Sequence, residues 1–378
     1  MKSNYKCIGE LIVECDERNT LNKDLELWGV SIDKKFIKSV ANIIGTDLTK
    51  YKVIEKDCFV CSLMQVSRDE KIPIARWNKD CLALVSPAYK VFKVKDEKVV
   101  LPEYMNLWFK RAEFDREASY YGVGGVRGSL EWSDFCDMRL PIPPIPEQQK
   151  IVDAYNTIEH RIELKRKINE NLEAQMQNLF NKELACLLTN DNLSVNYSII
   201  PLSEMAEYIN GLAMQNYTPE NEIENLPVLK IRELRQGYCD LNSDKCTSKL
   251  PAHITIQNGD IIFSWSGSLL VDIWAGGIAG LNQHLFNVVS NLYPKWLVYL
   301  WTKYYLSNFI RIADGKKTSM GHIKREDLDA AKVVVPQGLL LEKLNEKFDK
   351  IFVEIVRNKI ELNTLRQLFN LLLSTLSR

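Results

Sequence analysis

Residues 134–143 read DFCDMRLPIP, and residues 327–336 read DLDAAKVVVP. The two stretches lie 193 positions apart, and each follows a short motif, Gly128-Ser129-Leu130 in the first and Gly321-His322-Ile323 in the second. A repeat of this length is typical of a duplicated domain rather than of a solenoid. Other pairs keep nearly the same offset: IGEL (8–11) with LSEM (202–205), and LPEYMNLWF (101–109) with YPKWLVYLW (293–301). The chain is therefore predicted to contain one unit twice.

A 4, 3, 4, 3 spacing closes each copy and predicts a coiled-coil helix, because its average of 3.5 residues is the period of a helix-helix seam. The first series is Ile151, Tyr155, Ile158, Ile162, Lys165, Asn169, Leu172, Met176 and Leu179. The second series is Leu344, Phe348, Ile351, Ile355, Asn358, Leu362, Leu365, Phe369 and Leu372. Each helix is expected to span about 30 residues, or about 45 Å.

The two helices are predicted to pair with each other in antiparallel orientation, since that arrangement suits two equivalent units on one chain. Lys165 and Asn358 occupy the middle slot of each series and should then be neighbours. A single polar seam position fixes register at a cost in stability. The alternative is that each helix packs only on its own globular domain.

The fold class expected is α+β, with two small domains related by internal duplication and separated by the antiparallel helix pair. Prolines at 141, 143, 144 and 146 mark the first helix start, and TNDNLSVN (189–196) is the expected link between copies. The predicted segments are a first globular domain (1–143), a first long helix (144–190), a second globular domain (191–336) and a second long helix (337–378).

Composition and motifs exclude several classes of protein. Lys and Arg (49) balance Asp and Glu (49), so the whole chain has no electrostatic preference for nucleic acid. Nine cysteines with irregular spacing argue against a disulfide framework, and Cys58 and Cys61 are read as buried strand residues rather than as zinc ligands. The sequence lacks a P-loop, the Asn/Asp-Pro-Pro-Tyr/Phe turn of an adenine methyltransferase and any metal-ligand spacing. Without an apolar span or leader, a cytoplasmic protein is expected.

Three features together resemble the DNA-specificity (S) subunits of type I restriction-modification enzymes. LPIPPIPEQQKIV (140–152) resembles the proline-rich entry to that family's spacer helix. GDIIFSWSGS (259–268) and GLNQHLF (280–286) resemble the core of a target-recognition domain, and the duplicated organisation completes the likeness. The second copy departs at PQGLLLEKLN (336–345), where the proline run is lost.

The resemblance implies a non-catalytic chain whose two target-recognition domains each read one half of a split sequence in double-stranded DNA. It implies binding of two modification (methyltransferase) subunits, which would carry S-adenosylmethionine, and of restriction (motor-nuclease) subunits. No cofactor, metal or membrane contact is expected in this chain. Domains held about 45 Å apart would cover about 13 bp, which suits two half-sites separated by an unread spacer.

Side chains that pair with base edges or phosphates are the candidates for contact with DNA. The candidates are Arg76, Arg127, Ser266, Gln283, His284, Lys316, Lys317 and Thr318. Arg127 and Lys316 with Lys317 lie near equivalent ends of the two copies and are expected to contact phosphate. Two other functions stay open: a structural coiled-coil adaptor that does not read DNA, and a stand-alone DNA-modifying enzyme.

Overall fold

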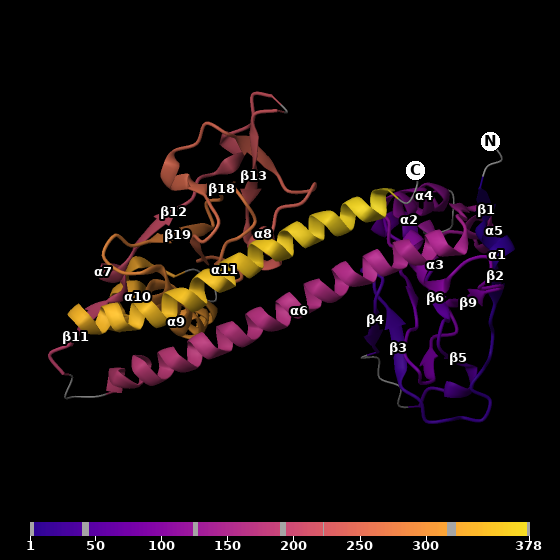
Figure 1. Ribbon diagram of the computed structural model, residues 1–378, viewed down its shortest axis with the longest axis horizontal. Coiled ribbons are helices and arrows are strands. Elements are labelled where there is room, and N and C mark those ends of the chain that lie inside the picture. Colours follow the sequence, from indigo (N-terminus) through magenta and orange to yellow (C-terminus); the bar gives the residue numbers. More distant parts are fainter. Residues whose placement is uncertain are drawn as a thin grey trace. The chain divides into compact units, whose positions relative to one another are not determined.

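The computed structural model describes residues 4–39, 45–123, 128–189, 194–221, 223–315 and 323–375. The chain divides into two compact units, unit 1 (Met1–His160 with Leu368–Arg378) and unit 2 (Arg161–Gln367). The division cuts both long helices, α6 (Ile145–Glu183) and α11 (Gly338–Thr375), which are the magenta and yellow helices in Figure 1. Each long helix therefore contributes residues to both units.

The described residues of unit 1 form two four-stranded sheets and a two-stranded ladder. The first sheet has the order β2 (Ile12–Glu14), β9 (Lys90–Val94), β6 (Phe59–Cys61) and β7 (Ile74–Arg76). The second has the order β4 (Phe36–Lys38), β3 (Leu27–Val30), β8 (Ala83–Val85) and β5 (Lys52–Ile54), and β1 (Tyr5–Cys7) pairs with β10 (Arg139–Pro141). The short helices are α1 (Ile8–Leu11), α2 (Val66–Asp69), α3 (Pro102–Phe109), α4 (Ala112–Gly122), α5 (Trp132–Asp137) and a 3₁₀ turn at Leu48–Lys50.

Strand alternation places the first sheet of unit 1 between two cores. Phe59 belongs to the core under α3, α4 and α5, whereas its neighbour Val60 belongs to the core between the two sheets. Successive side chains of a strand point to opposite faces, so a sheet covered on both faces requires an apolar residue at every position. The run FVC of β6 meets that requirement, and all three side chains are buried.

Unit 2 repeats the strand orders of unit 1 within its described residues. Its first sheet runs β12 (Glu207–Asn210), β19 (Leu285–Val289), β16 (Ile261–Ser264) and β17 (Leu270–Ile273). Its second runs β14 (Lys245–Thr247), β13 (Asn225–Leu229), β18 (Ala279–Leu281) and β15 (Thr255–Ile256), and β11 (Tyr197–Pro201) pairs with β20 (Lys332–Pro336). The helices are α7 (Leu202–Met205), α8 (Ile231–Gln236), α9 (Lys295–Gly315) and α10 (Arg325–Ala330), with 3₁₀ turns at Ala185–Thr189, Met214–Asn216 and Ala252–Ile254.

The matching topologies confirm the internal duplication and the α+β class. Even single hydrogen bonds recur: the amide of Ile8 donates to the carbonyl of Met138, and the amide of Leu202 donates to that of Ala331, each over 2.8 Å. Both bonds tie the first short helix of a unit to the segment that precedes its closing strand. The repeated sequence at 134–143 and 327–336 therefore has the same structural role in each copy.

The two long helices pair in antiparallel orientation, as predicted. Within unit 2, Arg161 contacts Glu361, Lys165 contacts Asn358, and the side-chain Nδ2 of Asn169 donates to the backbone carbonyl of Ile355 over 3.4 Å. Residue numbers thus rise along α6 as those of the contacting residues fall along α11, so the two helices run in opposite directions. Every side chain in the two predicted seam series is buried or half-buried.

The long helices exceed the predicted length of about 30 residues, with 39 residues in α6 and 38 in α11. The first begins at Ile145, inside the proline run, because a proline in the first helical turn needs no amide donor. It continues past Leu179 since Phe180 packs edge-to-face on Trp301 of α9 at 4.7 Å. The predicted domain boundaries themselves stay predictions.

Both long helices help to close the core of each unit. In unit 1, Tyr155 of α6 meets Phe369 of α11 with ring centroids 4.5 Å apart, and Leu373 is buried in the same core. In unit 2, Trp296 of α9 stacks on Phe348 of α11 at 4.2 Å. The alternative, in which each helix packs only on its own domain, is therefore wrong. Across the described ranges, no helix combines the length and apolar character needed to cross a bilayer.

Candidate nucleic-acid interface

Three of the predicted DNA-contacting residues come together in unit 2. The hydroxyl of Ser266 lies 2.9 Å from Nδ1 of His284, and Nε2 of Gln283 lies 3.4 Å from Nε2 of the same ring. Ser266 follows strand β16, whereas Gln283 and His284 immediately precede β19, its neighbour in the sheet. The pairing of these two strands therefore places the residues at one end of the sheet.

The Ser266 loop is held in place by its own backbone and by a neighbouring serine. Ser264, fully buried, donates through its hydroxyl to the carbonyl of Ser268 over 2.9 Å. Gly267 has a φ of +67°, a conformation that a residue with a side chain rarely adopts. Ser266 is buried, while Gln283 and His284 are half-buried, so the loop supports two side chains that reach the surface.

The segment after the basic loop is attached at the same place. The amide of Ile323 donates to the carbonyl of Trp265 over 3.3 Å, and the amide of Trp265 donates to the carbonyl of His284 over 3.4 Å. Lys316, Lys317 and Thr318 themselves lie outside the described residues, as does Arg127 in unit 1. Their predicted contacts with DNA stay predictions.

A cleft of about 300 Å³ adjoins this group, and sequence reasoning did not find it. Its lining includes Gln215, Lys230, Lys245 and Asn282. Asn282 joins the cleft to the Ser266 group because its Oδ1 accepts a hydrogen bond from the amide of His284 over 3.3 Å. Lysine and amide side chains are the types that contact phosphates and bases. Only strand pairing brings them together, so no local motif marks them.

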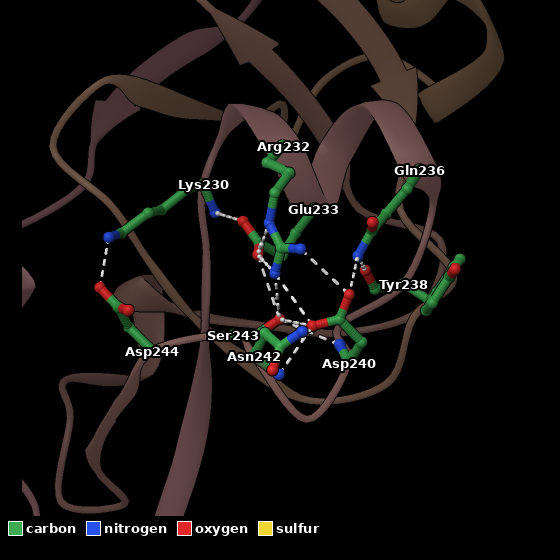
Figure 2. A network of polar contacts seen from close by, with 9 residues as sticks. All are labelled: Lys230, Arg232, Glu233, Gln236, Tyr238, Asp240, Asn242, Ser243 and Asp244. Carbon is green, nitrogen blue, oxygen red and sulfur yellow. Dashed lines mark hydrogen bonds and ion pairs between the residues drawn. The ribbon is translucent and has the colours of Figure 1, made fainter. Parts of the chain in front are cut away.

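An ion-pair network around the buried carboxylate of Glu233 fixes the segment that supplies Lys230 to the cleft (Figure 2). Arg232 contacts both Asp240 at 3.0 Å and Glu233 at 2.7 Å, and the Glu233 side chain is only 2% exposed. Ser243 donates to Glu233 over 3.1 Å. The hydrogen bonds from Arg232 hold the pKa of Asp240 below its usual range. The network is thus a charged support for the loop rather than a catalytic site.

Arg76, the candidate of unit 1 that the structure describes, lies in a different environment. It ends β7 and pairs with Asp57 and Glu103, and its side chain is 15% exposed. It lines a cleft of about 350 Å³ together with Tyr155 and Glu159 of α6. The Arg76 guanidinium forms ion pairs with two carboxylates. The surroundings of Arg76 in unit 1 therefore differ from those of the Ser266 group in unit 2.

The cysteines and histidines offer no metal site among the residues described, where no cluster of three or more His, Cys, Asp or Glu side chains is found. Cys58 and Cys61 are buried in unit 1 as predicted. Burial raises the pKa of Cys58 to about 11.

Fold and site together define a class: a duplicated α+β protein in which each copy has three layers (helices, sheet, sheet) and two long helices pair in antiparallel orientation. A solved structure with this fold is the S subunit of a type I restriction-modification system from M. genitalium, with a TM-score of 0.57 and 14% identity over 100% of this chain and 97% of that one. That likeness shows the fold.

Sequence comparison finds similarity to type I restriction specificity subunits. Residues 4–174 match the model of the type I restriction modification DNA specificity domain. The chain is 23% identical to the type I restriction enzyme MjaIX specificity subunit of Methanocaldococcus jannaschii over 305 residues, which are 73% of this chain and 68% of that one. It is 24% identical to the EcoKI specificity subunit of Escherichia coli over 220 residues, 54% of this chain and 46% of that subunit. Residues 4–174 therefore match a type I restriction modification DNA specificity domain, and the chain is similar over most of its length to a type I restriction enzyme specificity subunit, the family that its sequence resembles.

Proposed function

We propose that this chain is the non-catalytic subunit that reads a bipartite DNA sequence for a type I modification and restriction complex. Each unit reads one half-site, and the bases between the halves are not read. The observation that carries the proposal is the repeated strand order of the two units, because the same scaffold occurs twice and gives the chain two places that can carry reading side chains.

The two half-sites differ in sequence, since the residues at equivalent places differ. Strand β19 of unit 2 follows Asn282-Gln283-His284, whereas the equivalent strand β9 of unit 1 follows Ser86-Pro87-Ala88-Tyr89. An amide or an imidazole can pair with base edges, but proline and alanine offer only apolar contact. The hydroxyl of Ser86 already accepts a hydrogen bond from the amide of Ala88 over 3.3 Å, so we expect unit 1 to use another segment for its reading contacts.

The helix pair keeps the unread spacer constant and receives the modification subunits. Its buried polar centre favours one register, which suits a spacer of fixed length. Apolar side chains on its surface support docking: Leu164 and Ile168 are 46% and 43% exposed, and Val353 and Ile360 are 49% and 36% exposed. Members of each pair lie four or seven residues apart and so share one side of their helix. Two modification subunits carrying S-adenosylmethionine bind there, and restriction subunits join that complex.

The test is co-expression of the chain with its modification subunit, followed by genome-wide mapping of methyladenine. A split motif with a fixed gap is expected, and omission of this chain should abolish the methylation. Methylation of a continuous motif would contradict two separate reading sites. If the complex assembles but neither binds nor methylates DNA, the chain is an adaptor; if the purified chain alone modifies DNA, it is an enzyme.

A further inference from the structure

We infer that Gln65 and Arg68, on and beside helix α2, are specificity-determining residues of the first unit and contact base edges of its half-site. The inference rests on the proposed function and names the reading residues of one half. Arg76 pairs with Asp57 and Glu103, so the α2 segment offers the more accessible basic side chain of this unit, and the contact predicted for Arg76 stays a prediction.

The duplication places the α2 segment where the Ser266 loop lies in unit 2. In unit 1, residues 62–73 join β6 to β7; in unit 2, residues 265–269 join the equivalent strands β16 and β17. The anchoring bond is the same, since the amide of Leu130 donates to the carbonyl of Leu63 over 2.9 Å, as that of Ile323 donates to Trp265. The longer segment of unit 1 thus occupies the place in the fold that the Ser266 loop occupies in unit 2.

The α2 segment is held in an unusual conformation. Gln65 and Glu70, on either side of α2, have φ angles of +61° and +52°. Residues with side chains adopt such angles at a cost that persists only where the surroundings enforce them, and such positions cluster at functional sites. Gly128 lets its own loop pack closely against this segment, because a Cβ on Gly128 would lie 2.4 Å from the hydroxyl oxygen of Ser67.

The side chains that α2 presents are suited to reading purines. Arg68 is 66% exposed and donates through Nη2 to Oε1 of Gln65 over 2.8 Å. Its Nε contacts Asp69 at 3.1 Å, which holds the guanidinium in one orientation. Arginine pairs bidentately with guanine and glutamine with adenine, so a preset Arg-Gln pair can recognise a purine step. Met64, 59% exposed, adds an apolar contact beside them.

The experiment uses the chain co-expressed with its modification subunit and compares the methylated motifs of three variants with that of the wild type. Gln65→Gly removes the side chain and tolerates the positive φ; Arg68→Lys keeps the charge but loses bidentate geometry. Arg116→Ala is the matched control, because Arg116 is 70% exposed on neighbouring helix α4. Quantitative binding of the complex to matched and single-mismatch duplexes, over a range of salt, gives a second measurement.

Gln65→Gly and Arg68→Lys should each weaken the base preference at one or two positions of a single half-site. The ratio of binding to the correct and the mismatched base should fall about ten- to hundredfold there, while the other half-site is unchanged. Arg68→Lys should leave the salt dependence as it was, since the phosphate contacts remain. If the wild type gives a split motif and both variants keep it unaltered, the inference is overturned although the proposed function stands. A wild type without a split motif overturns both. Arg68 is exposed, so its variant folds and carries the test even if Gln65→Gly does not.

Discussion

Lys165 donates a hydrogen bond to Oδ1 of Asn358 over 2.7 Å, at the middle slot of both seam series. Asn358 is fully buried, and among the described residues its Nδ2 has no hydrogen-bond partner. The pair therefore lowers the stability of the helix pair but favours this register, because a shifted register that placed Asn358 opposite apolar side chains would leave its Oδ1 without a donor as well.

Replacing both residues by leucine should raise the free energy of unfolding by about 1 kcal/mol, since the gain from an apolar seam exceeds the loss of about 0.5 kcal/mol with the Lys165–Glu361 contact. Lys165→Leu alone should lower the free energy of unfolding by about 1–2 kcal/mol, because the side-chain oxygen of Asn358 then loses its hydrogen-bond donor. Denaturant unfolding of the two single variants and the double variant measures the coupling. Additive effects of the two substitutions would contradict the pairing.

The stability of the helix pair should fall at acid pH through Glu361. Hydrogen bonds from Lys165 and Arg161 hold the pKa of the Glu361 carboxyl below its usual value. A depressed pKa means that the stabilisation is present above the unfolded pKa, about 4.3, and is lost as the pH falls through the folded value. Between pH 5 and pH 3, the unfolding free energy of Glu361→Gln should therefore fall by about 0.5 kcal/mol less than that of the wild type. An identical pH profile for variant and wild type would show that the contact carries no energy.

The sequence predicted the features that depend on periodicity and repetition. The seam slots and the Lys165–Asn358 contact follow from spacing alone, because a rigid helix fixes which side chains face its partner. The expected length of about 30 residues was too short, since Phe180 extends the first helix and packs on Trp301. Arg76 illustrates the limit for sites: its partners Asp57 and Glu103 reach it only through the folded sheet and α3, so no local signal separates a base-reading arginine from a paired one.

Breaking the network of Figure 2 should destabilise unit 2. Arg232→Ala leaves the buried carboxylate of Glu233 without its cation, at a cost of about 2 kcal/mol in unfolding free energy. Arg235→Ala is the control, because Arg235 is exposed on the same helix α8. Thermal and denaturant unfolding of both variants provide the measurement. Equal losses for the two would refute a structural role for the Arg232 pair.

The buried thiols should be inert in the folded chain. Desolvation raises the pKa of Cys58 to about 11, and only a thiolate reacts rapidly with an alkylating reagent. At pH 8, iodoacetamide followed by mass spectrometry should label the exposed Cys81 and Cys186 well before Cys58 and Cys61. Unfolding in guanidinium should equalise the rates. Rapid labelling of Cys58 in the native chain would contradict its packing.

His284 should be the residue of unit 2 whose loss alters the recognised sequence most. Ser266 fixes the imidazole through Nδ1, so the ring reaches the surface in one orientation with Gln283 beside Nε2. We expect His284→Ala to relax one position of the half-site read by unit 2, lowering discrimination there by about 1–3 kcal/mol. Ser266→Ala should weaken the same position less, because it frees the ring but does not remove it. Methyladenine mapping with the co-expressed modification subunit reads out both variants, and His253→Ala, in the 3₁₀ turn Ala252–Ile254, is the control. Two outcomes would show that His284 does not read bases in its own unit. In the first, His284→Ala lowers sequence discrimination in the half-site that the α2 variants affect. In the second, it lowers methylation equally for every sequence.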